Sequence, residues 1–92
     1  MTHRAQELAV RIIKEQAAII GPLAWREAKK VAGLTVIGEK DATIEGKPAP
    51  VLDGLVKRYE RLFGPASREI CREAVRSLLP EIPAEDVPAV LK

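Results

Sequence analysis

Aromatic residues are nearly missing from this chain of 92 residues, which contains one tryptophan (Trp25), one tyrosine (Tyr59) and one phenylalanine (Phe63). The core must therefore consist of Ile, Leu, Val and Ala side chains, which pack well between helices. The scarcity of rings also leaves few surfaces on which nucleic-acid bases stack. Both features favour a helical domain whose interior is aliphatic.

Cysteine and histidine occur only once each, as Cys71 and His3. A single cysteine cannot form an internal disulfide, which is typical of a reducing compartment, and we predict a cytoplasmic protein with a buried structural thiol. One Cys and one His far apart do not provide the clustered ligands of a metal site. His3 lies at a terminus, where a general base would lack a fixed position. We therefore expect no enzyme, no cofactor and no metal.

Long apolar runs are absent as well, since no stretch approaches the roughly 20 residues of a membrane span. The first residues form an amphipathic segment interrupted by charges and do not look like a signal peptide. The net charge is only +2. Basic residues are in small excess in the helical parts, and acidic residues are in excess after residue 77. A dedicated nucleic-acid binder normally has a more one-sided charge. We predict a protein that does not act at a membrane.

Two Gly-Pro pairs, Gly21-Pro22 and Gly64-Pro65, each stand between amphipathic stretches. Ile19-Ile20 precedes the first pair and Leu62-Phe63 precedes the second, so the apolar positions have the same register. Glycine readily adopts the left-handed backbone conformation that ends a helix, and proline is well tolerated in the first turn of the next helix. The pattern predicts two helix–turn–helix units. Duplication and coincidence both explain the likeness, and the structural consequence is the same.

The predicted fold is mainly α, a single domain over residues 1–92 with four or five helices. Apolar residues form 47% and charged residues 30% of the chain, as in ordinary globular domains. The first helical hairpin covers 5–33, with its second helix running through Ala32 and capped by Gly33. The second hairpin covers 51–79, and 80–92 form a short C-terminal segment. The third helix carries an apolar stripe that we expect to face inward: Leu52, Leu55, Val56, Tyr59, Leu62 and Phe63.

Residues 34–50 differ from the amphipathic helical segments, because β-branched residues here flank the polar segment 38–41. A two-stranded β-hairpin at 34–45 and an ordered loop without a ladder both fit this pattern. Two strands alone bury too little to be stable, so a hairpin would pack on the helices or pair with its copy in a dimer. Residues 46–50 form a stiff connector, because their prolines favour an extended chain.

Two surfaces are candidates for protein interaction. Tryptophan is enriched at binding hot spots, which favours Trp25 at an interface, although core filling explains it equally well. The β-branched residues Val36, Ile37 and Ile44 offer a second surface through edge pairing between strands.

Arg68, Arg72 and Arg76 recur every four residues and form one line along the predicted fourth helix. Such a line suits contact with the phosphates of a nucleic acid. Glu69 and Glu73 alternate with these arginines, however, which favours an exposed face with salt bridges. Nucleic-acid binding through this line is therefore the alternative function.

Residues 55–91 resemble small helical modules of bacterial signalling proteins, which carry a Gly-Pro-Ile-Ala-like corner and often follow kinase or sensor regions. The likeness rests on Leu62-Phe63-Gly64-Pro65-Ala66, on Ala74-Val75 and on the segment from Pro83 to Pro88. The resemblance implies an interaction or assembly role and brings no catalytic residue. The predicted function is a non-enzymatic helical interaction or oligomerisation module in bacterial regulation. Its expected partner is a second copy of the chain, in a homodimer, or another protein.

Overall fold

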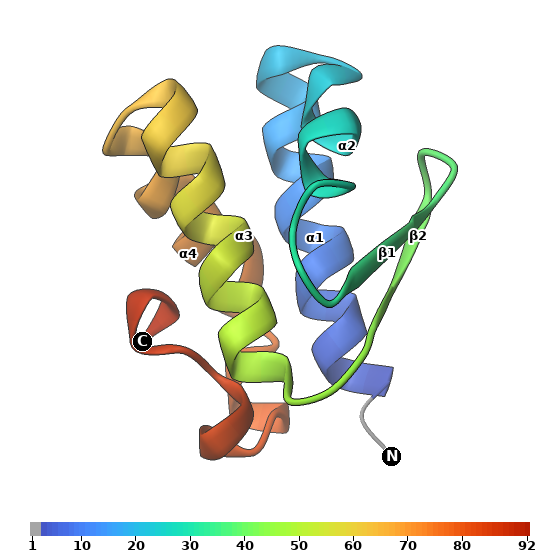
Figure 1. Cartoon of the computed structure of the whole chain (residues 1–92). Coiled ribbons are helices and arrows are strands. Elements are labelled where there is room, and N and C mark those ends of the chain that lie inside the picture. The colour runs from blue at the N-terminus through green and yellow to red at the C-terminus, as the bar shows by residue number, and fades with distance from the viewer. Residues whose placement is uncertain (1–2) are drawn as a thin grey trace.

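The computed structural model describes residues 3–92, with side chains from Arg4 onward, and is mainly helical (Figure 1). Its α-helices are α1 (His3–Ile20), α2 (Leu23–Ala28), α3 (Pro48–Phe63) and α4 (Ala66–Val75). The strands β1 (Leu34–Ile37) and β2 (Asp41–Ile44) form an antiparallel hairpin. Three short 3-10 helices follow: η1 (Leu79–Glu81), η2 (Ala84–Asp86) and η3 (Ala89–Leu91). This confirms the predicted fold class, and the 34–45 segment is a hairpin.

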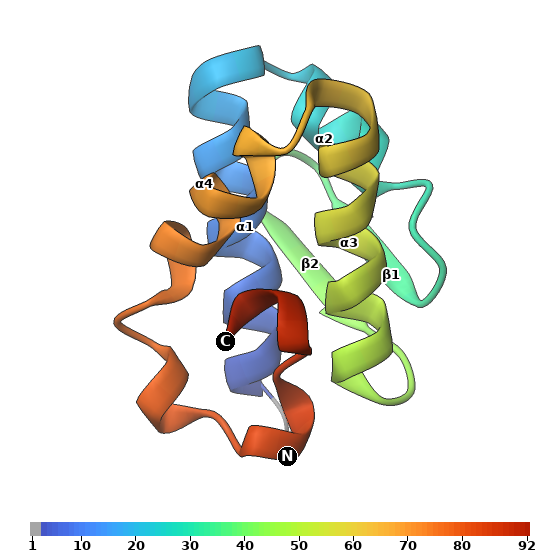
Figure 2. The same cartoon turned by 90° about the vertical axis from the view of Figure 1, so that its left-hand side faces the viewer.

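Both Gly-Pro corners lie at the same end of the molecule, at the top in both views (Figures 1 and 2). The helices α1 and α3 run toward that end, and α2 and α4 run back from it. The longest helix, α1, packs against α2, α3 and α4. The segment after α4 crosses the opposite end and returns along α3 and α4, where η3 contacts both helices.

The two corners have the same backbone geometry. Gly21 and Gly64 have φ angles of +74° and +96°, a region that favours glycine. The amide of Gly21 donates to the Ala17 carbonyl (2.8 Å), and the amide of Gly64 donates to the Glu60 carbonyl (2.9 Å). Each glycine carbonyl then accepts a hydrogen bond from the amide three residues later, at 3.1 Å in both corners. The prolines open the next helices, where a missing N–H costs nothing.

The core is aliphatic apart from Trp25 and Tyr59. Burial is greatest where α1, α3 and α4 meet, and the hairpin and the C-terminal segment cover the remaining sides. The hydroxyl of Tyr59 donates a hydrogen bond to the carbonyl of Ala24 (2.6 Å), which joins α3 to α2. The largest fully buried side chains are Tyr59, Leu8, Ile12, Ile13, Leu52 and Leu55.

The second helix is shorter than predicted. It ends at Ala28, and the chain turns through Lys29–Gly33 before β1 begins. Gly33 therefore does not cap a helix, and the prediction that α2 reaches Ala32 was wrong. Gly33 has a φ of +84°, and its carbonyl accepts a hydrogen bond from the Glu45 amide (2.8 Å), which closes the base of the hairpin. The chain reverses early because Leu34 has to enter the core.

The hairpin packs on the core through one of its two faces. Leu34 pairs with Ile44 and Val36 with Ala42, and these four residues share the face that packs on the core. The amide of Ile44 also donates to the side-chain oxygen of Gln6 on α1 (3.1 Å). A two-stranded sheet is marginal alone, so this packing and the bond from β2 to α1 stabilise it.

The third helix begins at Pro48, inside the predicted connector 46–50. Pro48 and Pro50 both lie in its first turn, where helical amides have no intrahelical partner and proline is tolerated. The connector is therefore shorter than predicted.

Candidate functional site

Trp25 is not at a surface. It is 5% exposed and belongs to the core, so of the two alternatives left open for it the structure favours core filling over a place at an interface. Trp25 lies in the short helix α2, and its neighbours Ala24 and Ala28 are also buried. Half of the six positions of this helix are therefore buried, and the indole is almost fully covered.

The hairpin offers less surface than predicted. The side chains of Val36 and Ile44 are partly buried and pack on the core, so they add little apolar surface for a partner. Pairing of the strand edge through its backbone groups stays a prediction. Ile37 is 47% exposed, on the face opposite to Leu34 and next to the hairpin turn. It is the only one of the four predicted interaction residues that solvent reaches freely.

The exposed apolar surface lies elsewhere, at the two Gly-Pro corners. Four of the five large hydrophobic residues that are exposed in the described chain flank Gly21 or Gly64 within two positions. We call this surface the corner face, and it consists of Ile19, Leu23, Leu62 and Phe63. Ile19 and Leu62 each stand two residues before the corner glycine, and they are 62% and 45% exposed. Equivalent positions of the two units thus present apolar side chains at the same end of the molecule.

A buried polar contact helps to fix the relative position of the two corners. The side-chain amide of Gln16 donates to the carbonyl of Ser67 (3.2 Å), which connects α1 to the first turn of α4. Gln16 and Ser67 are both buried. Gln16 was not singled out from the sequence, and no local pattern marks it, because its partner is far along the chain.

Leu62 and Phe63 were predicted to face inward, and this was wrong. Both continue the apolar stripe of α3, and Phe63 contacts Tyr59, with ring centroids 6.4 Å apart. A stripe is buried only where another element lies against it. The last turn of α3 leads directly into the corner, where the chain reverses and leaves these side chains exposed.

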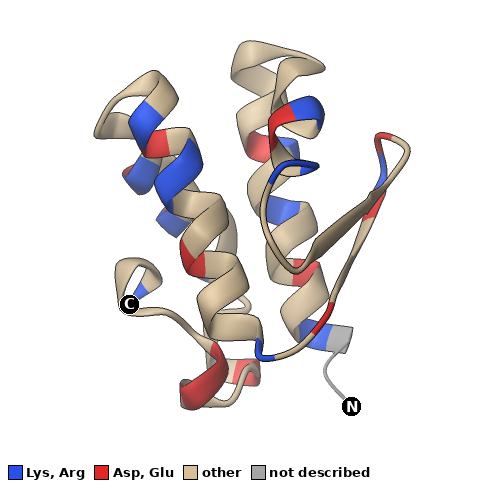
Figure 3. Cartoon of the chain, viewed as in Figure 1, with Lys and Arg blue, Asp and Glu red and all other residues tan. Residues whose placement is uncertain are grey.

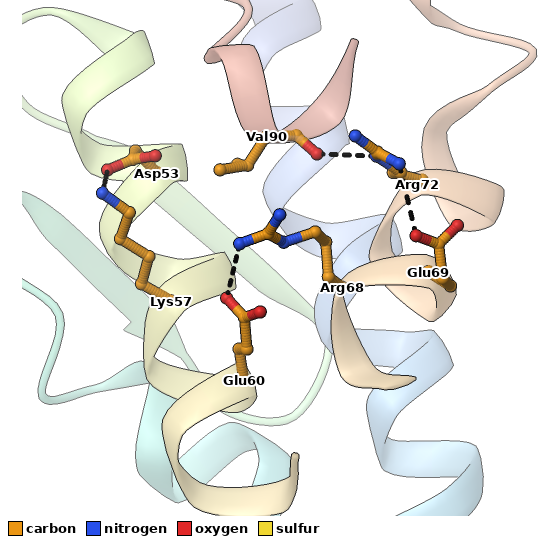
Figure 4. A network of polar contacts seen from close by, with 7 residues as sticks. All are labelled: Asp53, Lys57, Glu60, Arg68, Glu69, Arg72 and Val90. Carbon is orange, nitrogen blue, oxygen red and sulfur yellow. Dashed lines mark hydrogen bonds and ion pairs between the residues drawn. The ribbon is translucent and has the colours of Figure 1, made fainter. Parts of the chain in front are cut away.

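Arg68 and Arg72 of α4 and Arg76 just after it all make intramolecular contacts, and Figure 4 shows those of Arg68 and Arg72. Arg68 forms an ion pair with Glu60 of α3 (3.1 Å). Arg72 donates through Nε to the Val90 carbonyl (2.9 Å) and pairs through Nη1 with Glu69 (3.2 Å). Arg72 thereby holds the C-terminal segment on α4.

Arg76 is the most exposed of these arginines, and it pairs with Glu73 (2.6 Å). Since all three arginines have carboxylate partners, the line along α4 is the salt-bridged face that the alternating glutamates indicated. It presents little unpaired positive charge to a phosphate backbone.

Cys71 is fully buried on α4, and the side-chain amide of Gln16 donates to its Sγ (3.5 Å). Burial raises the pKa of the thiol from its ordinary 9.0 to about 11, and the Gln16 hydrogen bond opposes part of this rise. The thiol is therefore protonated at neutral pH, whereas a cysteine nucleophile acts as the thiolate.

Because the pKa of Cys71 is raised, the free energy of unfolding should decrease at alkaline pH. Between about pH 9 and 11 the native thiol keeps its proton while the unfolded thiol loses it, so stability falls as pH rises. We expect a loss of about 1 kcal/mol at pH 10 from this group. Urea unfolding at pH 7 to 10 measures it, with Cys71→Ala as the comparison. If the free energy of unfolding fell equally steeply with pH in wild type and in Cys71→Ala over this range, the raised pKa of Cys71 would not be its cause.

In the described part of the chain, no group of three or more His, Cys, Asp or Glu side chains is arranged to hold a metal ion. The side chain of His3 lies outside the described residues. No helix within residues 3–92 combines the length and apolarity needed to cross a membrane. Comparison of the chain with protein families, curated proteins and solved structures found no match.

Proposed function

We propose that this domain is a non-enzymatic protein-interaction module that self-associates through the corner face. The observation that carries the proposal is that Ile19, Leu23, Leu62 and Phe63 are exposed beside the two Gly-Pro corners, which lie at the same end of a small domain. Single exposed apolar residues are ordinary, but exposed apolar residues gathered together typically mark an interface.

The energetics favour coverage of this face by another protein surface. Fully burying one Leu, Ile or Phe side chain stabilises by about 1.5 to 3 kcal/mol, so four partly exposed ones provide a substantial driving force. The two corners present equivalent residues, which suits a self-complementary contact between two copies. The resemblance of residues 55–91 to modules of bacterial signalling proteins supports a regulatory role in the cytoplasm of a bacterium.

Nucleic-acid binding through Arg68, Arg72 and Arg76 has less support. Each arginine has a carboxylate partner within the domain, and the glutamates beside them would repel a polyanion. The aromatic rings suited to base stacking are also few, because Trp25 and Tyr59 are buried.

Solution mass tests the proposal. Light scattering after size exclusion should give a dimer, twice the 10.1 kDa of one chain, at low and moderate salt. The double variant Ile19→Ser/Leu62→Ser should be monomeric and remain helical, because it removes the two most exposed apolar side chains of the corner face. Ile37→Ser is the matched control, since it changes an exposed isoleucine at the end of β1, outside the corner face, and should remain dimeric. A monomeric wild type, or dissociation by Ile37→Ser alone, would reject the corner face.

A further inference from the structure

A cleft of about 580 Å³ lies between the turn after α2 and the middle of α3. Val31 and Ala32 line it on the side of the turn, and Gly54 lines it on the side of α3. The two elements approach closely here, since a Cβ added to Gly54 would lie 3.5 Å from the Cγ1 of Val31. Val31, Ala32 and Gly54 give the lining of the cleft an apolar part without bulky side chains.

Cations from two elements distant in sequence converge around this cleft. Lys30 comes from the turn after α2, and Lys57, Arg58 and Arg61 come from α3. Figure 3 shows Lys and Arg on both facing elements. Glu60 is the one acidic lining residue, and it is paired with Arg68 on the neighbouring helix.

The cations differ in how far they are already neutralised. Arg58 and Lys30 both pair with the poorly exposed carboxylate of Glu27, at 2.7 and 3.4 Å. The hydrogen bond from Arg58, with help from Lys30, holds the pKa of Glu27 below its ordinary value, so this carboxylate stays charged and keeps both cations in place. Two cations around one carboxylate leave an excess of positive charge.

The remaining two cations, Lys57 and Arg61, are both exposed and lie on α3. Lys57 pairs only with Asp53 (3.0 Å), in an exposed contact that contributes little. Arg61 has no ion pair with any residue that the structure describes. Lys57 and Arg61 are four residues apart on α3 and therefore stand side by side on one face of the helix.

We propose that this cleft binds an acidic peptide segment of a partner protein, with a carboxylate on Lys57 and Arg61 and a small apolar side chain on Val31, Ala32 and Gly54. A guanidinium matches a carboxylate through two parallel hydrogen bonds. The acids around the cleft are Glu27, Glu60 and Asp53, the partner of Lys57 that a ligand carboxylate would have to displace. Three acids disfavour the continuous phosphates of a nucleic acid more than they disfavour one short acidic segment. The site shares no residue with the corner face, although Arg61 is next to Leu62 in the chain, and the proposal does not require self-association.

Fluorescence anisotropy of a short labelled peptide of alternating glutamate and leucine, titrated with the whole chain, tests the site. Wild type should bind it, more weakly as salt rises, and the same peptide with glutamine in place of glutamate should not bind. Lys57→Ala/Arg61→Ala should weaken binding at least about tenfold, because two charge-assisted contacts are lost. Both side chains are exposed, so the variant should fold normally.

The matched control is Lys14→Ala/Lys40→Ala, which removes the same charge at exposed positions away from the cleft and should retain wild-type affinity. An equal loss in both double variants would mean that only net charge matters, which overturns the site. Absence of peptide binding, or tighter binding of single-stranded DNA through Lys57 and Arg61, would also overturn it. Ile19→Ser/Leu62→Ser should still bind the peptide, so failure of the dimer proposal and failure of this one can be told apart.

Discussion

Tyr59→Ala is expected to lower the free energy of unfolding by about 3 to 5 kcal/mol, the range for truncating a large buried aromatic side chain. Tyr59 is the largest fully buried side chain, and its hydroxyl donates to the Ala24 carbonyl at 2.6 Å. The ring thus connects α3 of the second helical unit to α2 of the first. A loss of this size is a large part of the stability of a small domain.

Tyr59→Phe separates the two contributions of this side chain. It keeps the ring and removes the hydroxyl, so we expect a loss of about 1 to 1.5 kcal/mol. Urea unfolding monitored by circular dichroism measures both variants, and fluorescence of the buried Trp25 provides a second probe from α2. If Tyr59→Ala lowered the free energy of unfolding by no more than Tyr59→Phe does, the ring would not be packed in the core as described.

Gly33→Ala is expected to destabilise the domain by about 2 to 4 kcal/mol, because backbone strain and a steric clash act together. Gly33 has a φ of +84°, which alanine adopts at a cost. Its new Cβ would also lie 2.6 Å from the Cγ2 of Val51 and 3.2 Å from the Glu45 carbonyl oxygen. Val51 lies in the first turn of α3 with a stiff β-branched side chain, and the carbonyl belongs to the backbone, so neither can move cheaply.

Gly46→Ala is the matched control for this prediction. Gly46 has nearly the same φ, +83°, but nothing lies within 4 Å of an added Cβ. Gly46→Ala should therefore lower the free energy of unfolding only through backbone strain at positive φ, by about 1 to 2 kcal/mol. The difference between the two variants measures the contact of the hairpin base with α3. Equal losses in urea unfolding would show that Gly33 does not closely approach Val51.

Some features of the cleft and the corner face were visible in the sequence, and others were not. The equivalent apolar pairs before Gly21 and Gly64 were recognised, but Leu62 and Phe63 were placed inside because they continue a helical stripe. For the cleft, nothing local indicated that Lys30 would face the basic residues of α3. Trp25 was left open between core and interface, since a residue type alone does not report its surroundings.

The sequence by itself determined the helical class, the aliphatic core and the two Gly-Pro corners. These features depend on residue periodicity and on the backbone preferences of glycine and proline, which act over a few neighbouring bonds. Only the tertiary structure decided that α2 stops at Ala28, that the 34–45 hairpin forms, and that Trp25 is buried while Ile19 and Leu62 are exposed. Burial and charge clustering are properties of elements brought together from distant parts of the chain, and no local pattern contains that information.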